Sequence, residues 1–246
     1  MLNFLTGPIT SLLVFLYGIS GENLGLAIIL LTVVIRGVLV PVTIPSLRSA
    51  KKMQELKPHL DKLKEKHKDK QKLQLAQLDL YKQHGVNPAA GCLPQVAQLL
   101  VLIALYQVFI DFINTGQFNG HSLNLNFFWL NLGKPDQYYI LPILAGLTQL
   151  IFSFMMTSGL EGHLKAPKNK KEKQKEEDSL EMAQSMSQQM LYIMPAMTVI
   201  IALNFPSGLA LYWVITTLFS LVQQYIISGL GGLKPVLARL RIIKSI

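Results

Sequence analysis

The stretch LGLAIILLTVVIRGVLVPVTIPS, residues 24–46, decides the fold class. It is predominantly apolar, and Arg36 is its single charged side chain. About 20 apolar residues are enough for a helix to cross the hydrocarbon core of a bilayer. The sequence therefore predicts a membrane-spanning helix over residues 21–46, and its arginine is the feature that needs an explanation.

Four further apolar stretches follow, and they predict a membrane protein with five spans. Half of the 246 residues are hydrophobic and 15% are charged, whereas a soluble domain carries roughly 25% charged residues. Turn-forming residues separate the last two stretches, which predicts a tight hairpin between antiparallel spans. The four predicted spans cover residues 92–113, 138–158, 189–204 and 207–230.

Residues 1–20 are predicted to form an amphipathic helix that lies in the membrane interface. Their apolar part, Ile9 to Ile19, is too short to cross a bilayer, and it follows Pro8, which suits the first position of a helix. No lysine or arginine precedes it, so it lacks the charged start of a signal peptide. A divergent signal sequence is the alternative.

Lysine and arginine gather in three segments that five alternating spans would place on one side of the membrane. These segments, residues 47–91, 159–188 and 231–246, hold 21 of the 23 basic residues. Basic residues accumulate in cytoplasmic loops. We therefore expect the N-terminus outside, the C-terminus in the cytoplasm, and residues 114–137 as an extracytoplasmic loop.

The three cytoplasmic segments differ in pattern. Residues 47–91 carry two runs of leucines at helical spacing around a charged tip, which predicts a helical hairpin. Residues 159–188 mix lysine and glutamate with few apolar residues, which predicts a mobile loop. Residues 231–246 form a basic tail.

Arg36 lies about 12 residues into its span, or roughly 18 Å deep at 1.5 Å per residue. A charge at that depth costs on the order of 2.5–3.5 kcal/mol unless it meets water or a partner. Asp111, at the outer end of the second span, differs from it in depth by roughly 16 Å, which is too far for an ion pair. Snorkelling to the cytoplasmic interface would have to cover most of about 12 Å. We therefore predict that Arg36 faces a water-filled cavity.

Other polar side chains on the predicted spans favour a shared polar groove. Each of them alone more often joins two helices than binds a ligand. Together with an arginine that has no acidic partner, they indicate one hydrophilic surface. The candidate groove residues are Arg36, Thr32, Gln95, Gln98, Gln149, Trp213, Thr217 and Ser220.

Catalytic and metal-binding patterns are not recognisable in the sequence. Cys92 is the single cysteine, and the five histidines lack the spacing of metal ligands. No nucleophile with an aligned base and no glycine-rich phosphate loop can be identified. We therefore expect neither an enzyme nor a metal or cofactor site.

Two motifs carry a family resemblance. Residues 87–106, NPAAGCLPQVAQLLVLIALY, and residues 205–224, FPSGLALYWVITTLFSLVQQ, resemble the second and last spans of the YidC-type membrane protein insertases. Arg36 stands where that family has an arginine in its groove, and the charged hairpin follows at once. Two positions differ: Leu100 stands where the family often has proline, and Thr217 where it often has asparagine.

The resemblance covers nearly the whole chain and implies the short form of the family, which lacks a large periplasmic domain. The implied fold is all-α, with five transmembrane helices around a hydrophilic groove, an N-terminal interfacial helix and a cytoplasmic helical hairpin. The implied protein is an insertase and chaperone of the prokaryotic cytoplasmic membrane. It moves short polar segments of nascent membrane proteins across the bilayer and releases their helices into lipid.

The resemblance also implies partners: nascent membrane proteins, the ribosome, sometimes the Sec translocon, and membrane lipids, but no specific DNA. Ribosome contact would use the basic residues of the hairpin and tail. The candidates are Lys64, Lys66, Lys68, Lys70, Arg239 and Arg241.

A small transporter or channel, and a passive membrane anchor that recruits ribosomes, are the alternatives. Transporters usually show internal repeats and acidic residues near the middle of the membrane, and the sequence has neither. A passive anchor would give no reason for a buried arginine.

Overall fold

The computed structural model describes residues 3–66, 69–86, 93–115, 124–156 and 178–234. These residues divide into two compact units, and each is treated separately below. The first unit comprises residues 1–43, 93–149 and 195–222, and the second comprises residues 44–92, 150–194 and 223–246.

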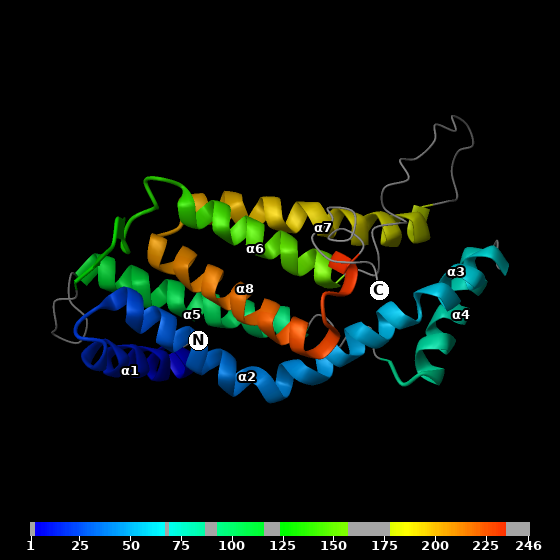
Figure 1. Cartoon of the computed structure of the whole chain (residues 1–246), viewed down its shortest axis with the longest axis horizontal. Coiled ribbons are helices and arrows are strands. Elements are labelled where there is room, and N and C mark those ends of the chain that lie inside the picture. The colour runs from blue at the N-terminus through cyan, green and yellow to red at the C-terminus, as the bar shows by residue number, and fades with distance from the viewer. Residues whose placement is uncertain (1–2, 67–68, 87–92, 116–123, 157–177, 235–246) are drawn as a thin grey trace. The chain divides into compact units, whose positions relative to one another are not determined.

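Nearly all of the described residues are helical, which confirms the predicted all-α class (Figure 1). One small antiparallel hairpin, between β1 (Asn126–Phe127) and β2 (Leu130–Asn131), was not predicted. A 3₁₀ turn at Gly231–Leu233 follows the last helix. The helices are α1 (Asn3–Ile19), α2 (Leu24–Glu55), α3 (Lys57–Lys66), α4 (Lys70–Gln83), α5 (Leu93–Thr115), α6 (Ile140–Met156), α7 (Asp178–Asn204) and α8 (Ser207–Ser228).

Two of these helices extend beyond the predicted limits. Helix α2 continues to Glu55, past the predicted end of the first span at residue 46. Helix α7 begins at Asp178, so the last part of residues 159–188, predicted as a mobile loop, is helical. Leucine, methionine, alanine, glutamate and glutamine predominate there, and all are good helix formers. Residues 157–177 lie outside the described ranges.

Length and composition alone qualify α2 and α8 as membrane-crossing helices. Shorter apolar helical stretches occur at Thr6–Ile19, Gln98–Asp111, Ile140–Met156 and Leu191–Asn204. Many large apolar side chains on the helices are exposed, including Val38, Ile200 and Val222. Soluble proteins rarely expose such extended apolar surfaces. These surfaces are therefore suited to contact with lipid.

The first unit is a helical bundle with one apolar core. Helix α1 packs against α5 (Figure 1) and buries one face, including Leu13 and Leu16. Glycine allows α6 and α7 to approach closely: a Cβ added at Gly146 on α6 would lie 2.2 Å from Val199 on α7. Small residues permit such contacts between membrane helices, because the two backbones can then come close together. The other helices contribute buried residues such as Ile28, Leu31, Leu105, Leu209 and Leu211.

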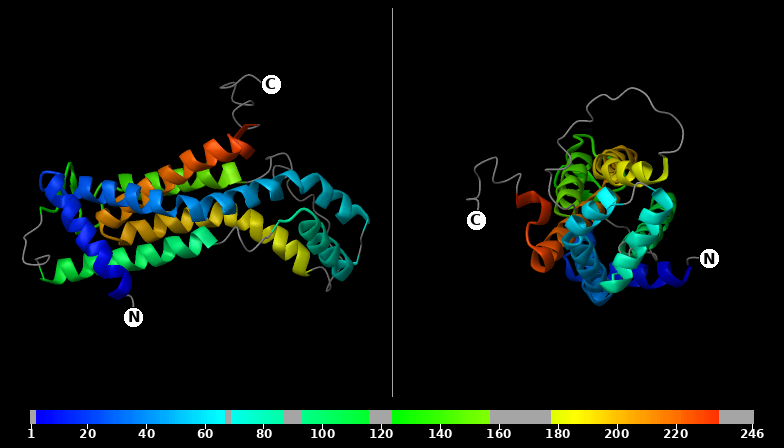
Figure 2. Two further views of the ribbon diagram at one scale, coloured as in Figure 1. Left: turned by 90° about the horizontal axis from the view of Figure 1, so that it is seen from below. Right: turned by 90° about the vertical axis from the view of Figure 1, so that its right-hand side faces the viewer.

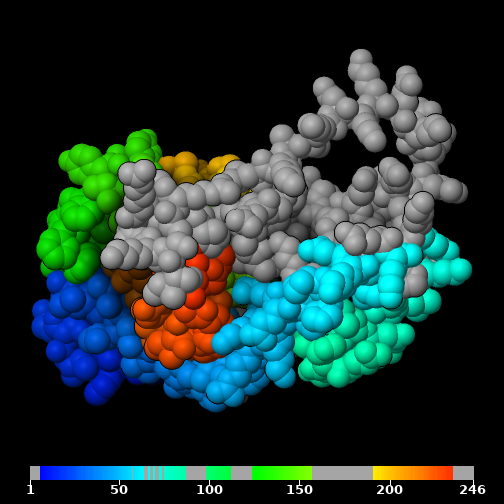
Figure 3. All heavy atoms as spheres, turned by 45° about the vertical axis from the view of Figure 1, so that its right-hand side comes forward, coloured from blue at the N-terminus to red at the C-terminus, as the bar shows by residue number. Residues whose placement is uncertain are grey.

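The second unit contains the helical hairpin of α3 and α4, which lie side by side in Figures 1 and 2 and form one continuous surface in Figure 3. Leu73 is buried on α4, as is Leu56 just before α3. Helix α4 ends in a Schellman motif, in which Val86 N–H donates to the carbonyl of Tyr81 at 2.9 Å. Gly85 supplies the positive φ, +62°, that this cap requires.

The extension of α2 is also bonded within the second unit. Lys51 Nζ donates to the carbonyl of Ile227 near the C-terminus of α8 at 3.2 Å. The Gln54 side-chain amide donates to the carbonyls of Met155 and Met156 at the end of α6. These donors satisfy carbonyls that a helix end otherwise leaves free, which explains why α2 continues beyond its apolar stretch.

Candidate functional site

Helix α2 places Arg36 inside the first unit, where only 8% of its surface is exposed. Thr32, one turn earlier, and Thr43, two turns later, are buried on the same face. The Thr32 hydroxyl donates to the carbonyl of Ile28 at 2.6 Å. This hydroxyl is therefore already bonded within its own helix, and Arg36 is the group on this face that reaches outward.

A short hydrogen-bonded chain joins α2, α5 and α8 at Arg36. Arg36 Nη2 donates to Gln98 Oε1 at 2.7 Å. Gln98 Nε2 in turn donates to the hydroxyl oxygen of Tyr212 at 2.9 Å. Tyr212 is buried, and tyrosine hydroxyls in apolar surroundings usually find a partner of this kind. The structure therefore brings together Arg36 and Gln98, two of the candidate groove residues, and adds Tyr212, which was not among them.

The charge of Arg36 is held by neutral groups. Among the described residues, no acidic side chain forms an ion pair with it, and its Nε has no hydrogen-bond partner. Burying a charge without an opposite charge is costly in a low-dielectric environment. The Nε of the guanidinium is thus a buried donor whose hydrogen-bonding capacity is unused. The water-filled cavity that was expected beside it stays a prediction.

The predicted polar stripe on α8 is only partly available for binding. Thr217 is buried, and its hydroxyl donates to the carbonyl of Trp213 at 2.9 Å. Ser220 is half-buried and donates to the carbonyl of Thr216 at 3.0 Å. Hydroxyls bonded to the preceding turn in this way present less polarity to a neighbour. Trp213 itself is half-buried.

The other candidate groove residues are not connected to the chain of Arg36 within the described part of the protein. Gln149 is half-buried on α6. The Gln95 side chain lies outside the described residues. Leu100, where the family often has proline, is exposed on α5. Its side chain therefore changes the outer surface of that helix and does not line the buried site.

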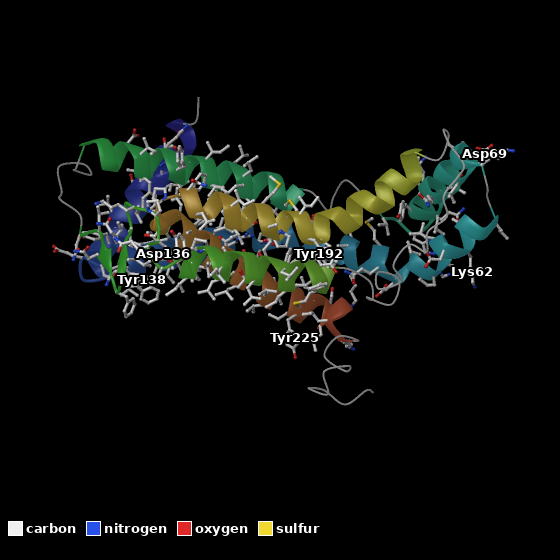
Figure 4. All side chains as sticks on the ribbon, turned by 90° about the horizontal axis from the view of Figure 1, so that it is seen from above. Lys62, Asp69, Asp136, Tyr138, Tyr192 and Tyr225 are labelled. Carbon is white, nitrogen blue, oxygen red and sulfur yellow. The ribbon has the colours of Figure 1, made fainter. Side chains whose placement is uncertain are left out.

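Of the basic residues proposed for ribosome contact, Lys66 is exposed at the end of α3. Lys62 on α3 and Asp69 just before α4 are also exposed, and Figure 4 shows both on the α3–α4 hairpin. The side chains that lie outside the described residues are Lys64, Lys68, Lys70, Arg239 and Arg241.

The second motif is explained by packing at the start of α8. Ser207 N–H donates to the carbonyl of Lys134 at 2.7 Å, and Gly208 N–H donates to that of Leu132 at 3.0 Å. A Cβ added at Gly208 would lie 2.5 Å from the ring of Phe109. Glycine is therefore required here, because α5, α8 and the loop before α6 meet at this point.

Comparison with known proteins agrees with this arrangement. The family model for the 60Kd inner membrane protein matches residues 15–231. The chain is 38% identical over 227 residues to membrane protein insertase MisCA of Bacillus subtilis, covering 90% of this chain and 77% of that protein. It is 37% identical to membrane protein insertase YidC 2 of Bacillus anthracis, covering 90% and 78% of the two chains. It is also 33% identical to membrane protein insertase YidC of Fusobacterium nucleatum, covering 85% and 88%.

A solved structure shares the fold. The crystal structure of an active YidC insertase with its first transmembrane domain resolved superposes with a TM-score of 0.63 at 23% identity. The match covers 91% of this chain and 46% of the solved chain, so the present chain spans about half of that protein. The family match and the relatives together show that this chain is a membrane protein of the 60Kd inner membrane protein family, the YidC-type insertases.

Proposed function

We propose that this protein inserts other proteins into the bacterial cytoplasmic membrane. It would move short polar segments of nascent membrane proteins across the bilayer and release their apolar helices into lipid. The observation that carries the proposal is Arg36: it is buried, its guanidinium is bonded to the neutral Gln98, and it has no acidic partner among the described residues. The insertase names of the relatives support the same activity.

The proposed mechanism uses Arg36 as a transient partner for an acidic stretch of the incoming chain. A carboxylate would replace the Gln98 carbonyl at the guanidinium, because charge-assisted hydrogen bonds are roughly twice as strong as neutral ones. Water and polar side chains in a hydrophilic groove would lower the cost of moving the rest of that segment. The proposed groove residues are Arg36, Thr32, Gln95, Gln98, Gln149, Trp213, Thr217 and Ser220.

Release would follow from partition into lipid. Moving about 20 apolar residues from water to hydrocarbon is strongly favourable, at about 25 cal/mol per Å² of apolar surface. That gain would draw the incoming helix sideways out of the groove and separate its acidic segment from Arg36. The scheme therefore requires no bound nucleotide.

The proposal includes a topology with five spans and the N-terminus outside. The spans would be formed by α2, α5, α6, the C-terminal part of α7, and α8, with α1 in the outer interface. The α3–α4 hairpin and the basic tail would then lie in the cytoplasm and contact the ribosome or anionic lipid. Cooperation with the Sec translocon belongs to the same proposal.

Reconstitution of the purified protein alone tests the proposal. Proteoliposomes would receive a single-span substrate with an acidic translocated tail, and protection of that tail from added protease would report insertion. We expect Arg36→Lys to retain insertion and Arg36→Glu to impair it. Insertion by Arg36→Ala at the wild-type rate for every such substrate would overturn the role of Arg36.

Two controls distinguish the effect of the charge at position 36 from that of a charge change elsewhere on the protein. Arg48 is exposed on the same helix, so Arg48→Glu should leave insertion unchanged. A substrate with a neutral tail should be insensitive to Arg36→Glu. Ion flux across the same proteoliposomes would indicate a channel, and failure of the wild-type protein to insert any substrate would indicate a passive anchor.

A further inference from the structure

Four aromatic side chains are exposed at the end of the first unit where α6 begins. Phe128 is 84% exposed, Trp129 48%, Tyr138 63% and Tyr139 57%. Figure 4 places Tyr138 beside Asp136, just before α6. Large aromatic rings gathered in this way on a water-facing loop would be unfavourable, because each leaves apolar surface in water.

The backbone holds two of these rings outward at a conformational cost. Phe127 pairs with Leu130, so Phe128 and Trp129 form a two-residue hairpin turn. Phe128 has a φ of +51°, and Trp129 is not among the residues with positive φ. Glycine is the usual residue at this first turn position. Tyr139 has a φ of +59° as well. A bulky residue at a positive φ strains the backbone, and such strained residues cluster at functional sites. The outward position of these rings therefore indicates a function.

The aromatic segment is firmly attached to the bundle. The Phe127 ring lies so close to Gly25 that a Cβ added there would be 2.2 Å away. Asp136 accepts hydrogen bonds from the N–H groups of Tyr138 at 3.1 Å and Leu141 at 2.8 Å, which caps α6. The carbonyl of Leu132 accepts from the first turn of α8. The segment is therefore fixed where α2, α6 and α8 begin.

The exposed aromatic rings continue an exposed apolar face. Directly after Tyr139, α6 exposes Ile140, Ile143, Leu144 and Leu147. In a membrane protein such a face contacts acyl chains. Tyrosine and tryptophan are enriched at the level of the lipid headgroups, where the ring is apolar and its N–H or O–H meets water.

We infer that Phe128, Trp129, Tyr138 and Tyr139 form an aromatic anchor that inserts into the boundary between headgroups and acyl chains. Its partner is bilayer lipid, and it fixes the depth at which α2, α6 and α8 enter the membrane. This anchor requires only that the protein resides in a membrane, and it does not depend on the role of Arg36.

The tryptophan content of the chain permits a direct test. Trp129 and Trp213 are its two tryptophans, so Trp213→Phe leaves Trp129 as the single reporter and Trp129→Phe leaves Trp213 as the matched control. Each variant of the full chain would be reconstituted in phosphatidylcholine vesicles whose lipids carry bromine either near the headgroup end or near the end of the acyl chain. Acrylamide would report access from water.

We expect Trp129 to show blue-shifted emission, and to be quenched more by bromine near the headgroups than by bromine at the chain ends. Strong acrylamide quenching of Trp129 with no effect of brominated lipid would overturn the inference. Protection of Trp129 from acrylamide that disappears when the vesicles are diluted with lipid would also overturn the inference, because a second copy of the chain would then be the partner.

A second variant in the same background separates anchoring from folding. Phe128→Gly places glycine at the strained turn position, so thermal stability in detergent should not fall. The loss of the ring should weaken quenching of Trp129 by headgroup-end bromine and increase its quenching by acrylamide. Unchanged quenching in Phe128→Gly would show that the exposed ring at position 128 does not contact lipid.

Discussion

At the level of single residues, the guanidinium of Arg36 has a neutral partner where the protein could have carried an acid. Gln98 differs from glutamate by one amide group, and it lies 2.7 Å from Arg36. A permanent carboxylate at this position would neutralise the charge, whereas the amide holds the side chain in place and leaves its charge available. The identity of residue 98 therefore bears directly on the proposed mechanism.

Substitution of Gln98 by glutamate tests this argument. A built-in carboxylate should compete with the acidic tail of the substrate, and a charge-assisted bond worth about 1.5–3 kcal/mol corresponds to roughly tenfold slower insertion or more. The measurement is the initial rate of substrate insertion in proteoliposomes. Gln98→Leu serves as the comparison, since it removes the bond without supplying a competing charge. A wild-type rate in Gln98→Glu would contradict the competition.

Tyr212 is predicted to support the site by orienting Gln98. Tyr212→Phe removes the acceptor of the Gln98 N–H and leaves this half-buried donor without a partner, which should lower the stability by about 1 kcal/mol. Thermal unfolding in detergent measures the change. Tyr225, exposed on the same helix (Figure 4), provides the control, because Tyr225→Phe removes an equal hydroxyl without an interior role. Equal effects of the two substitutions would argue against the orienting bond.

At the level of helices, the sequence predicted which segments are helical better than it predicted where each helix begins and ends. Hydrophobic runs identify α5 and α8, because the apolar character of a helix depends on its composition over several turns. The end of α2 at Glu55 could not be found in this way. It depends on Lys51 and Gln54 bonding to carbonyls of α8 and α6, which are distant in sequence.

The contact of α6 with α7 at Gly146 gives a prediction about packing. Gly146→Ala should destabilise the protein by about 1–3 kcal/mol, because the added methyl group would overlap Val199. Combining it with Val199→Ala should recover part of that loss, and thermal unfolding of the single and double variants would measure the coupling. Gly37 on α2 has no atom within 4 Å of an added Cβ. Gly37→Ala should therefore leave the stability unchanged or raise it, and an equal loss at both glycines would rule out a specific contact.

At the level of the whole molecule, the proposed orientation can be tested with two exposed lysines. Lys134 precedes α6, and Lys66 ends α3. In a Cys92→Ser background, Lys134→Cys should react with a membrane-impermeant maleimide in intact spheroplasts. Lys66→Cys should react only after permeabilisation, because basic segments remain in the cytoplasm. Labelling of Lys66→Cys in sealed cells would reverse the topology.

The sequence by itself determined that this is a helical membrane protein with an arginine inside an apolar stretch long enough to cross a bilayer. Hydropathy, charge and length are properties of contiguous residues, so they require no knowledge of which helices meet. Only the tertiary structure decided that Arg36 meets Gln98, which is 62 residues away in sequence. The same is true of the contact between Gln98 and Tyr212, which are 114 residues apart. It also decided that Phe128 is held outward at a positive φ. Helical periodicity fixes the face of a residue within its own helix, but the rotation and depth of each helix against its neighbours follow from packing between distant segments.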